Sequence, residues 1–155
     1  MELTLYRAWV FLGAIEAALV LGGFFFVLLR AGWHPGAAVS SSDPLHGDYL
    51  RATTMTLAGI VACQIGTALA ARTEHASLRS VGLFTNRLLL WGMASEIAFA
   101  AALIYLPPFQ GAFGTAPLRP LDLAVLLPFP FVVWGADELR RFLLRRSRET
   151  ADRVQ

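Results

Sequence analysis

Trp91 to Pro108, WGMASEIAFAAALIYLPP, is apolar almost throughout, yet it carries the carboxylate of Glu96 near its middle. As a helix rising about 1.5 Å per residue, an apolar run of this length approaches the hydrocarbon thickness of a bilayer, about 30 Å. Pro107 and Pro108 cannot continue a helix, so the run should end there. The stretch therefore predicts a membrane-spanning helix that holds an acid in its interior.

The composition of the whole chain indicates the same environment. Of the 155 residues, 56% are hydrophobic and only 15% are charged, and the mean hydropathy is +0.56. This balance, with apolar residues in long blocks rather than short periodic runs, is typical of a membrane protein. The single cysteine, Cys63, lies inside an apolar block and excludes an intrachain disulfide.

Four apolar blocks follow one another and predict an all-α membrane protein with a single membrane domain over residues 1–155. The predicted helices cover residues about 8–29, 52–71, 88–106 and 121–144, and a basic tail follows over 145–155. Loops rich in Gly, Ser, Pro and Asp join the first helix to the second and the third to the fourth, and a short polar turn joins the middle two. Pro128 and Pro130 should kink the fourth helix. A signal peptide is the alternative for the first block, but the block is longer than a usual signal core.

The arginines predict the orientation in the membrane. All thirteen basic residues are arginine, and placing both termini in the cytoplasm leaves only Arg30, Arg51 and Arg119 outside. Basic residues concentrate on the cytoplasmic side of short-loop membrane proteins. The sequence therefore predicts four transmembrane helices with both termini cytoplasmic, in the cell membrane as a multi-pass protein.

Polar side chains inside the predicted spans are the candidate functional residues. Glu16 and Glu96 lie near the midplane, where a carboxylate costs about 2.5–3.5 kcal/mol on insertion scales. Gln64 and Thr67 lie one turn apart on one face of the second helix. Carboxylate, amide and hydroxyl oxygens suit Ca²⁺, Mg²⁺ or Na⁺ rather than copper or zinc. These four residues form the predicted cation or proton site.

Each of these residues also has a structural interpretation. Gln64 and Thr67 are residue types that commonly form hydrogen bonds between membrane helices. Glu16 or Glu96 can serve as a protonated acid that only packs against its neighbours. Asp137 and Glu138, followed by arginines at the end of the fourth helix, predict an interfacial ion-pair cluster with Arg140 and Arg141.

Helical geometry predicts that Glu96 faces the second helix rather than lipid. At 3.6 residues per turn, small residues that permit close helix approach lie one turn before and after the acid. The face shared with the acid should hold Gly92, Phe99, Ala100 and Leu103, and the lipid face should hold Leu90, Ile97, Ala101 and Ile104.

Several catalytic and binding motifs are absent from the sequence. It contains no G-x-x-x-x-G-K-[ST] phosphate loop, no supported Ser/His/Asp grouping, no Cys/His metal cluster and no aromatic-basic surface for nucleic acid. We therefore expect a chain that is not an enzyme by itself, that needs no cofactor and that has no nucleic-acid partner.

The order of the segments resembles the C-terminal membrane region, the last four of ten helices, of type II P-type cation-transporting ATPases. GAIEAALVLGGFFF is similar to their seventh helix, MTLAGIVACQIGTALAARTEHASL to the eighth, SEIAFAAALIYLPP to the ninth and PFPFVVWGADELRRFLLRR to the tenth. In this resemblance Gln64 falls where the eighth helix supplies a cation ligand, and Glu96 matches a site-associated glutamate of the sodium-pump branch. Thr67 stands where that branch carries an acid.

The resemblance implies a function in cation transport. The chain would support the core helices of a pump and contribute to a cation or proton site, as a truncated product or one half of a split pump. Its partners would be the ATP-hydrolysing domains and first six helices, the lipid bilayer and an inorganic cation. The alternative is a stand-alone membrane interaction or regulatory protein derived from such a pump. An independent small carrier is less consistent with the sequence, which shows no inverted repeat.

The predicted orientation can be tested by cysteine accessibility. Cysteines introduced at Ser41 and Ser77 should differ, because the loops around His46 and Gly114 are expected outside and the turn holding Ser77 inside. A membrane-impermeant thiol reagent should label position 41 in intact cells and position 77 only after the cells are opened. Labelling of position 77 from outside intact cells would reverse the orientation.

Overall fold

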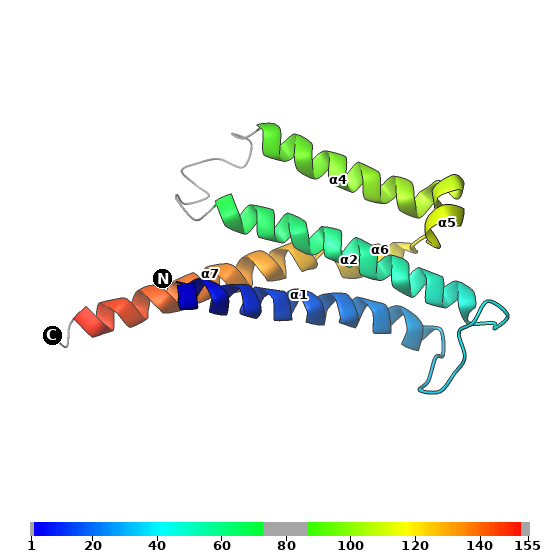
Figure 1. Ribbon diagram of the computed structural model, residues 1–155, viewed down its shortest axis with the longest axis horizontal. Helices are drawn as coiled ribbons and strands as arrows, with labels where there is room; N and C mark the ends of the chain where they lie inside the picture. The colour runs from blue at the N-terminus through cyan, green and yellow to red at the C-terminus, as the bar shows by residue number, and fades with distance from the viewer. Residues whose placement is uncertain (1, 73–86, 153–155) are drawn as a thin grey trace.

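The computed structural model describes residues 2–72 and 87–152, and within these ranges every regular element is a helix (Figure 1). The helices are α1 (Glu2–Arg30), α2 (His46–Arg72), α4 (Arg87–Tyr105), α5 (Pro107–Phe113), α6 (Pro120–Leu126) and α7 (Phe129–Asp152). Four segments are long and apolar enough to cross a membrane: Val10–Arg30, His46–Ala70, Arg87–Tyr105 and Pro120–Phe142. This confirms the predicted all-helical class with four spans, while the polar turn expected between the second and third lies outside the described residues.

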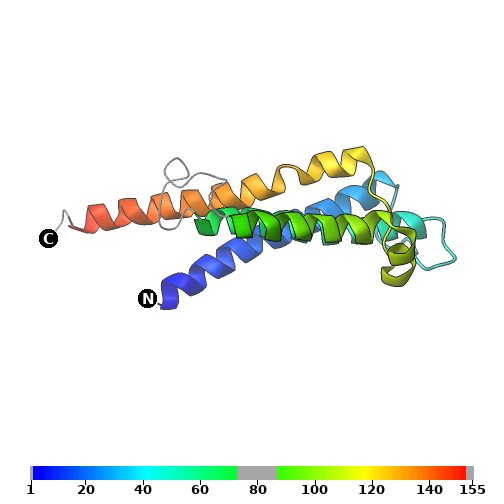
Figure 2. The ribbon, with the colours of Figure 1, turned by 90° about the horizontal axis from the view of Figure 1, so that it is seen from above.

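Helix α2 is the central element of the bundle. Figure 1 shows α2 between α1 and α4, and α2 contacts α1, α4, α6 and α7. The start of α1 and the end of α7 lie at the same end of the bundle, and the loop after α1 lies at the other end with α5 (Figures 1 and 2). The arrangement therefore places the two termini of the described chain on one side of the four spans.

Helix α2 begins at His46 instead of Ala52, so it includes charged residues that are predicted to lie in a loop. Asp48, in the first turn, suits the positive end of the helix dipole and forms an ion pair with Arg51 at 2.8 Å. Arg51 is also within 3.5 Å of Asp122 from α6 and is buried. These pairings compensate the charges, so the helix can begin a turn and a half earlier than its apolar pattern indicates.

Prolines set the boundaries of the later helices. Pro107 and Pro108 end α4 as predicted, but they also occupy the first turn of α5, a position that favours proline. A short helix therefore replaces part of the expected loop. The predicted kink in the fourth span is a break at Leu127 and Pro128 that separates α6 from α7. Helix α7 then continues to Asp152, into the segment expected to be a tail.

Gly66 marks a close approach of two backbones in the core, between α2 and α7. A Cβ atom added to Gly66 would lie 2.6 Å from the carbonyl oxygen of Pro130, 2.9 Å from its Cα and 3.0 Å from Cβ of Val133. Only a residue without a side chain fits there, as in other closely packed membrane helices. The surrounding core is apolar and includes Met55 and Phe129, which are nearly inaccessible to solvent.

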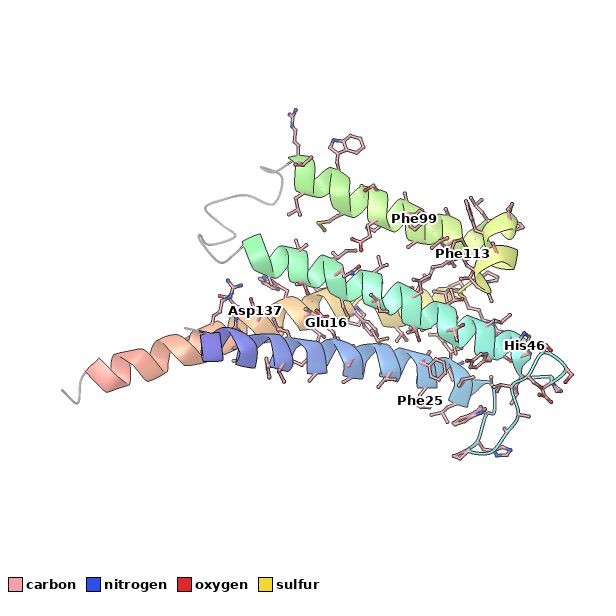
Figure 3. The ribbon with its side chains drawn as sticks, viewed as in Figure 1. Glu16, Phe25, His46, Phe99, Phe113 and Asp137 are labelled. Atoms are coloured by element: carbon pink, nitrogen blue, oxygen red, sulfur yellow. The ribbon has the colours of Figure 1, made fainter. Side chains whose placement is uncertain are left out.

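The predicted interfacial ion-pair cluster forms around Asp137, at the end of the bundle that holds the termini (Figure 3). Asp137 is buried and pairs with Arg140 at 2.7 Å and with Arg141. Arg141 also donates a hydrogen bond to the carbonyl oxygen of Ala70, at 2.9 Å. The cluster therefore joins α7 to the last turns of α2, while Glu138 is exposed and lies outside it.

Replacing Gly66 with alanine should weaken the contact between α2 and α7. The added methyl group would overlap the backbone of Pro130, which cannot move as a flexible side chain can, so we expect a loss of about 1–3 kcal/mol in the free energy of unfolding. Unfolding of the purified chain in mixed micelles by increasing dodecyl sulfate measures this difference.

Gly22→Ala is the matched control, because nothing lies within 4 Å of a Cβ atom added to Gly22 in α1. That variant should be neutral or slightly more stable, since alanine is the better helix former by about 0.5–1 kcal/mol. Equal stabilities of the two variants would contradict the assignment of Gly66 as the close-approach residue.

Candidate cation site

A hydrogen bond joins two polar side chains on different membrane-spanning helices. Thr67 on α2 donates its hydroxyl hydrogen to Oε1 of Glu16 on α1, with 2.7 Å between the oxygens. Figure 3 shows Glu16 about midway along α1, on the side that faces α2. Two residues from the predicted site, separated by fifty-one positions in the sequence, are therefore in direct contact.

The pair lies at the edge of the bundle rather than in its core. Glu16 is half-buried, whereas Thr67 is exposed. Gln64 and Ile60 are also exposed on the same face of α2. The adjoining face of α2, with Cys63 and Gly66, is buried. Helix α2 therefore has one face in the core and one face that carries Gln64 and Thr67 outward.

Glu96 lies apart from this pair. It is half-buried on α4, and among the described residues it makes no hydrogen bond or ion pair with Glu16, Gln64 or Thr67. Because α2 lies between α1 and α4, the third and first spans approach α2 from different sides (Figure 1). The structure therefore joins two of the four predicted site residues and leaves the other two without such a contact.

The buried face of α4 differs in part from the predicted one. Ala100 and Leu103 are buried as expected, and Ile97 is 50% exposed, as expected for the lipid side. Phe99 is 61% exposed and Ile104 only 4% exposed, so both of those assignments were wrong. The helix is rotated so that Ala100, Leu103 and Ile104 contact the bundle, a face that begins one turn after Glu96.

The chemistry of the exposed face is that of an incomplete oxygen site. A carboxylate, a hydroxyl and a nearby amide supply hard oxygen atoms, which suit Ca²⁺, Mg²⁺ or Na⁺ and also a proton. A calcium ion takes about six to eight oxygen ligands, more than Glu16, Thr67 and Gln64 provide together. Within the described residues, no group of three or more His, Cys, Asp or Glu side chains converges to hold a metal.

The contacts of Arg51 with Asp48 and Asp122 at the other end of the bundle were not predicted from the sequence. The sequence does single out Arg51, because it is one of only three arginines on the side predicted to be outside. The Gly, Ser, Pro and Asp residues that precede Arg51 favour a loop instead.

Comparison with known proteins identifies the region to which these helices correspond. The family described as "Cation transporting ATPase, C-terminus" matches residues 1–143. Calcium-transporting ATPase type 2C member 2 from Mus musculus is 30% identical over 149 residues, which are 94% of this chain and 15% of that protein.

Other relatives match a smaller part of the chain. Calcium-transporting ATPase 1 from Yarrowia lipolytica is 34% identical over 100 residues, 64% of this chain and 11% of that protein. The sodium/potassium-transporting ATPase subunit alpha-1 of Oreochromis mossambicus is 34% identical over 94 residues, 61% of this chain and 9% of that protein. The chain thus spans about a seventh or less of the length of these relatives.

These matches agree with the four membrane-capable helices and describe a multi-pass membrane protein. The family match covers the hydrogen-bonded residues Glu16 and Thr67, and it also covers the ion-pair cluster around Asp137 near the end of the fourth span. The chain belongs to the family of P-type cation-transporting ATPases and corresponds to their C-terminal membrane domain.

Proposed function

We propose that the chain acts as the C-terminal membrane segment of a cation pump, where it supports the transport core and contributes oxygen atoms to a cation or proton site. The observation that carries this proposal is the hydrogen bond between Thr67 and Glu16 on a face that the described helices leave exposed. A polar pair inside a membrane-spanning region is costly unless it is compensated or used. A neighbouring helix that covers this face would complete the site.

The partner would be the remainder of a P-type ATPase, with the first six helices and the domains that hydrolyse ATP. The incomplete set of oxygen ligands and the small share of each relative that the chain covers both support this proposal. Phosphoryl transfer would come from that partner, and this chain would not catalyse it alone. The comparisons give no support to a stand-alone interaction protein.

The orientation of the segment belongs to the same proposal. We infer that both termini are cytoplasmic, because α1 starts and α7 ends at the same end of the bundle (Figure 1). The predicted topology also places most of the arginines on the side of the membrane that holds the termini, as is typical of the cytoplasmic side. The Asp137 cluster would then lie near the cytoplasmic surface, where its arginines can meet anionic headgroups.

The transported ion is the finer part of the proposal. The relatives include both calcium-transporting ATPases and a sodium/potassium-transporting ATPase subunit. We favour the sodium-pump-like branch because of Glu96, which is half-buried on α4. Glu96 lies one turn before Ala100, the first buried residue of that helix. Glu96 would act as a second acid, separate from the Glu16–Thr67 pair.

The dependence on a partner can be tested in the DNA that surrounds the coding sequence. Translation of the DNA upstream of the Met1 codon should reveal a D-K-T-G motif and six further membrane helices, and the encoded protein should co-purify with this chain. As a control, the chain alone incubated with ATP should form no acid-stable, hydroxylamine-sensitive phosphoenzyme. An unrelated neighbouring gene or a phosphoenzyme formed by this chain alone would contradict the proposal.

The role of the polar pair can be tested by removing its charge while preserving its shape. Glu16→Gln keeps an oxygen that accepts the Thr67 hydrogen bond, so folding should be retained. In the assembled pump, however, the apparent cation affinity should fall by about tenfold or more, the scale of one charged ligand contact of about 1.5–3 kcal/mol. The measurement is ATP hydrolysis as a function of cation concentration.

Glu138→Gln is the matched control, since it makes the same charge change at an exposed acid outside the pair. Glu96→Gln distinguishes the two acids: a loss of cation-dependent activity would assign Glu96 to a site, and an unchanged pump would assign it to packing. If Glu16→Gln and Glu138→Gln behave alike, the pair has no part in cation binding.

A further inference from the structure

Three arginines that are far apart in the sequence line one cavity at the end of the bundle opposite the termini. Arg30 ends α1, Arg51 is in the second turn of α2 and Arg119 immediately precedes α6. The cavity has a volume of about 160 Å³, and its lining is completed by Val27, Ala31, Asp48, Leu121 and Asp122. These are the same three arginines that the distribution of basic residues places on the outer side of the membrane.

Arg51 is the buried member of this arginine cavity. The residue is 8% exposed, and its Nη1 pairs with Asp48 at 2.8 Å. Its Nε lies 3.5 Å from Oδ2 of Asp122 and has no hydrogen-bond acceptor among the described residues. A buried guanidinium thus keeps a donor unsatisfied, which is costly unless a further acceptor occupies the site.

The charges that line the cavity do not balance. Both carboxylates are already engaged, because Asp48 pairs with Arg51 and Asp122 accepts a hydrogen bond from the backbone N–H of Arg119 at 2.9 Å. Arg30 and Arg119 are exposed, and their guanidinium groups form no ion pair within the described parts of the chain. The guanidinium of Arg30 instead lies over the ring of Phe26, 5.5 Å from its centroid. Three cations and two anions leave the lining with net positive charge.

The location of the arginine cavity matches the depth of lipid phosphates. Arg30 is the last residue of the first membrane span, and Arg119 directly precedes the fourth. Arginines at the ends of spans reach the interface between hydrocarbon and water. The volume is many times the roughly 10–15 Å³ that one water molecule requires, which leaves room for a phosphate group with bound water.

We propose that this cavity binds a phosphate-class oxyanion, held by the guanidinium groups of Arg30 and Arg119 with Arg51 at the inner wall. Guanidinium forks match the geometry of phosphate oxygens and form charge-assisted, bidentate hydrogen bonds with them. The phosphate comes either from the headgroup of a phospholipid or from free inorganic phosphate. In both cases the ligand would tie the end of α1 to the starts of α2 and α6. This inference does not depend on the cation site or on a partner chain.

Calorimetric titration of the purified full chain in uncharged detergent tests the proposal. The probes are inorganic phosphate and short-chain dihexanoyl phosphatidylglycerol, at an ionic strength near 0.15 M, where charges are screened over about 8 Å. The unmodified chain should bind at least one probe. The double variant Arg30→Gln, Arg119→Gln should bind it about tenfold or more weakly, because it loses two charged hydrogen-bond donors.

Arg87→Glu is the control, because it removes the same two units of charge from an exposed position on α4 away from the cavity. It should bind the probes as the unmodified chain does, and circular dichroism should show that all variants remain helical. Binding of phosphatidylglycerol alone identifies a lipid headgroup as the ligand, and comparable binding of both probes identifies the phosphate group itself. The proposal would be overturned if neither probe binds, or if Arg87→Glu weakens binding as much as the double variant does.

Discussion

The contact of Gly66 with the backbone of Pro130 is the constraint on which the bundle depends. The missing side chain at Gly66 lets α7 approach the backbone of α2, and no larger residue fits the same space. Between membrane helices, lipid is as apolar as the side chains, so close packing rather than the hydrophobic effect holds the helices together. The break at Leu127 and Pro128 starts α7 at the place where this contact begins, so the proline-rich segment and the glycine act together.

The central position of α2 explains why its two faces differ. One face contacts α7 and the apolar core, and the other face is left with Gln64, Thr67 and the hydrogen bond to Glu16. A polar face on a membrane helix is unfavourable where it meets lipid. The exposed polar face is consistent with the proposal that further helices of a pump cover it.

Charged contacts fasten the two ends of α2, while its middle is packed by apolar side chains. At one end of α2, Arg51 pairs with Asp48 of the same helix and lies near Asp122 of α6. At the other end, Arg141 of α7 pairs with Asp137 and donates a hydrogen bond to the carbonyl oxygen of Ala70 on α2. Ion pairs at these positions lie near the ends of the spans, where water and headgroups reduce the cost of charge. The fourth span is thus attached to α2 at both ends, in addition to the close approach at Gly66.

The sequence by itself determined the helical class, the four spans and the end of α4 at Pro107, because hydropathy over about twenty residues and the missing N–H of proline are local properties. It also predicted the pairing of Asp137 with Arg140 and Arg141, which are neighbours on one helix. Only the tertiary structure decided that Glu16 meets Thr67, that Glu96 does not join them, and that Phe99 is exposed while Ile104 is buried. It also brought three arginines from distant parts of the sequence to one cavity. Those outcomes depend on how far each helix is rotated about its axis and how closely it approaches its neighbours, and the spacing of residues along one helix does not fix either quantity.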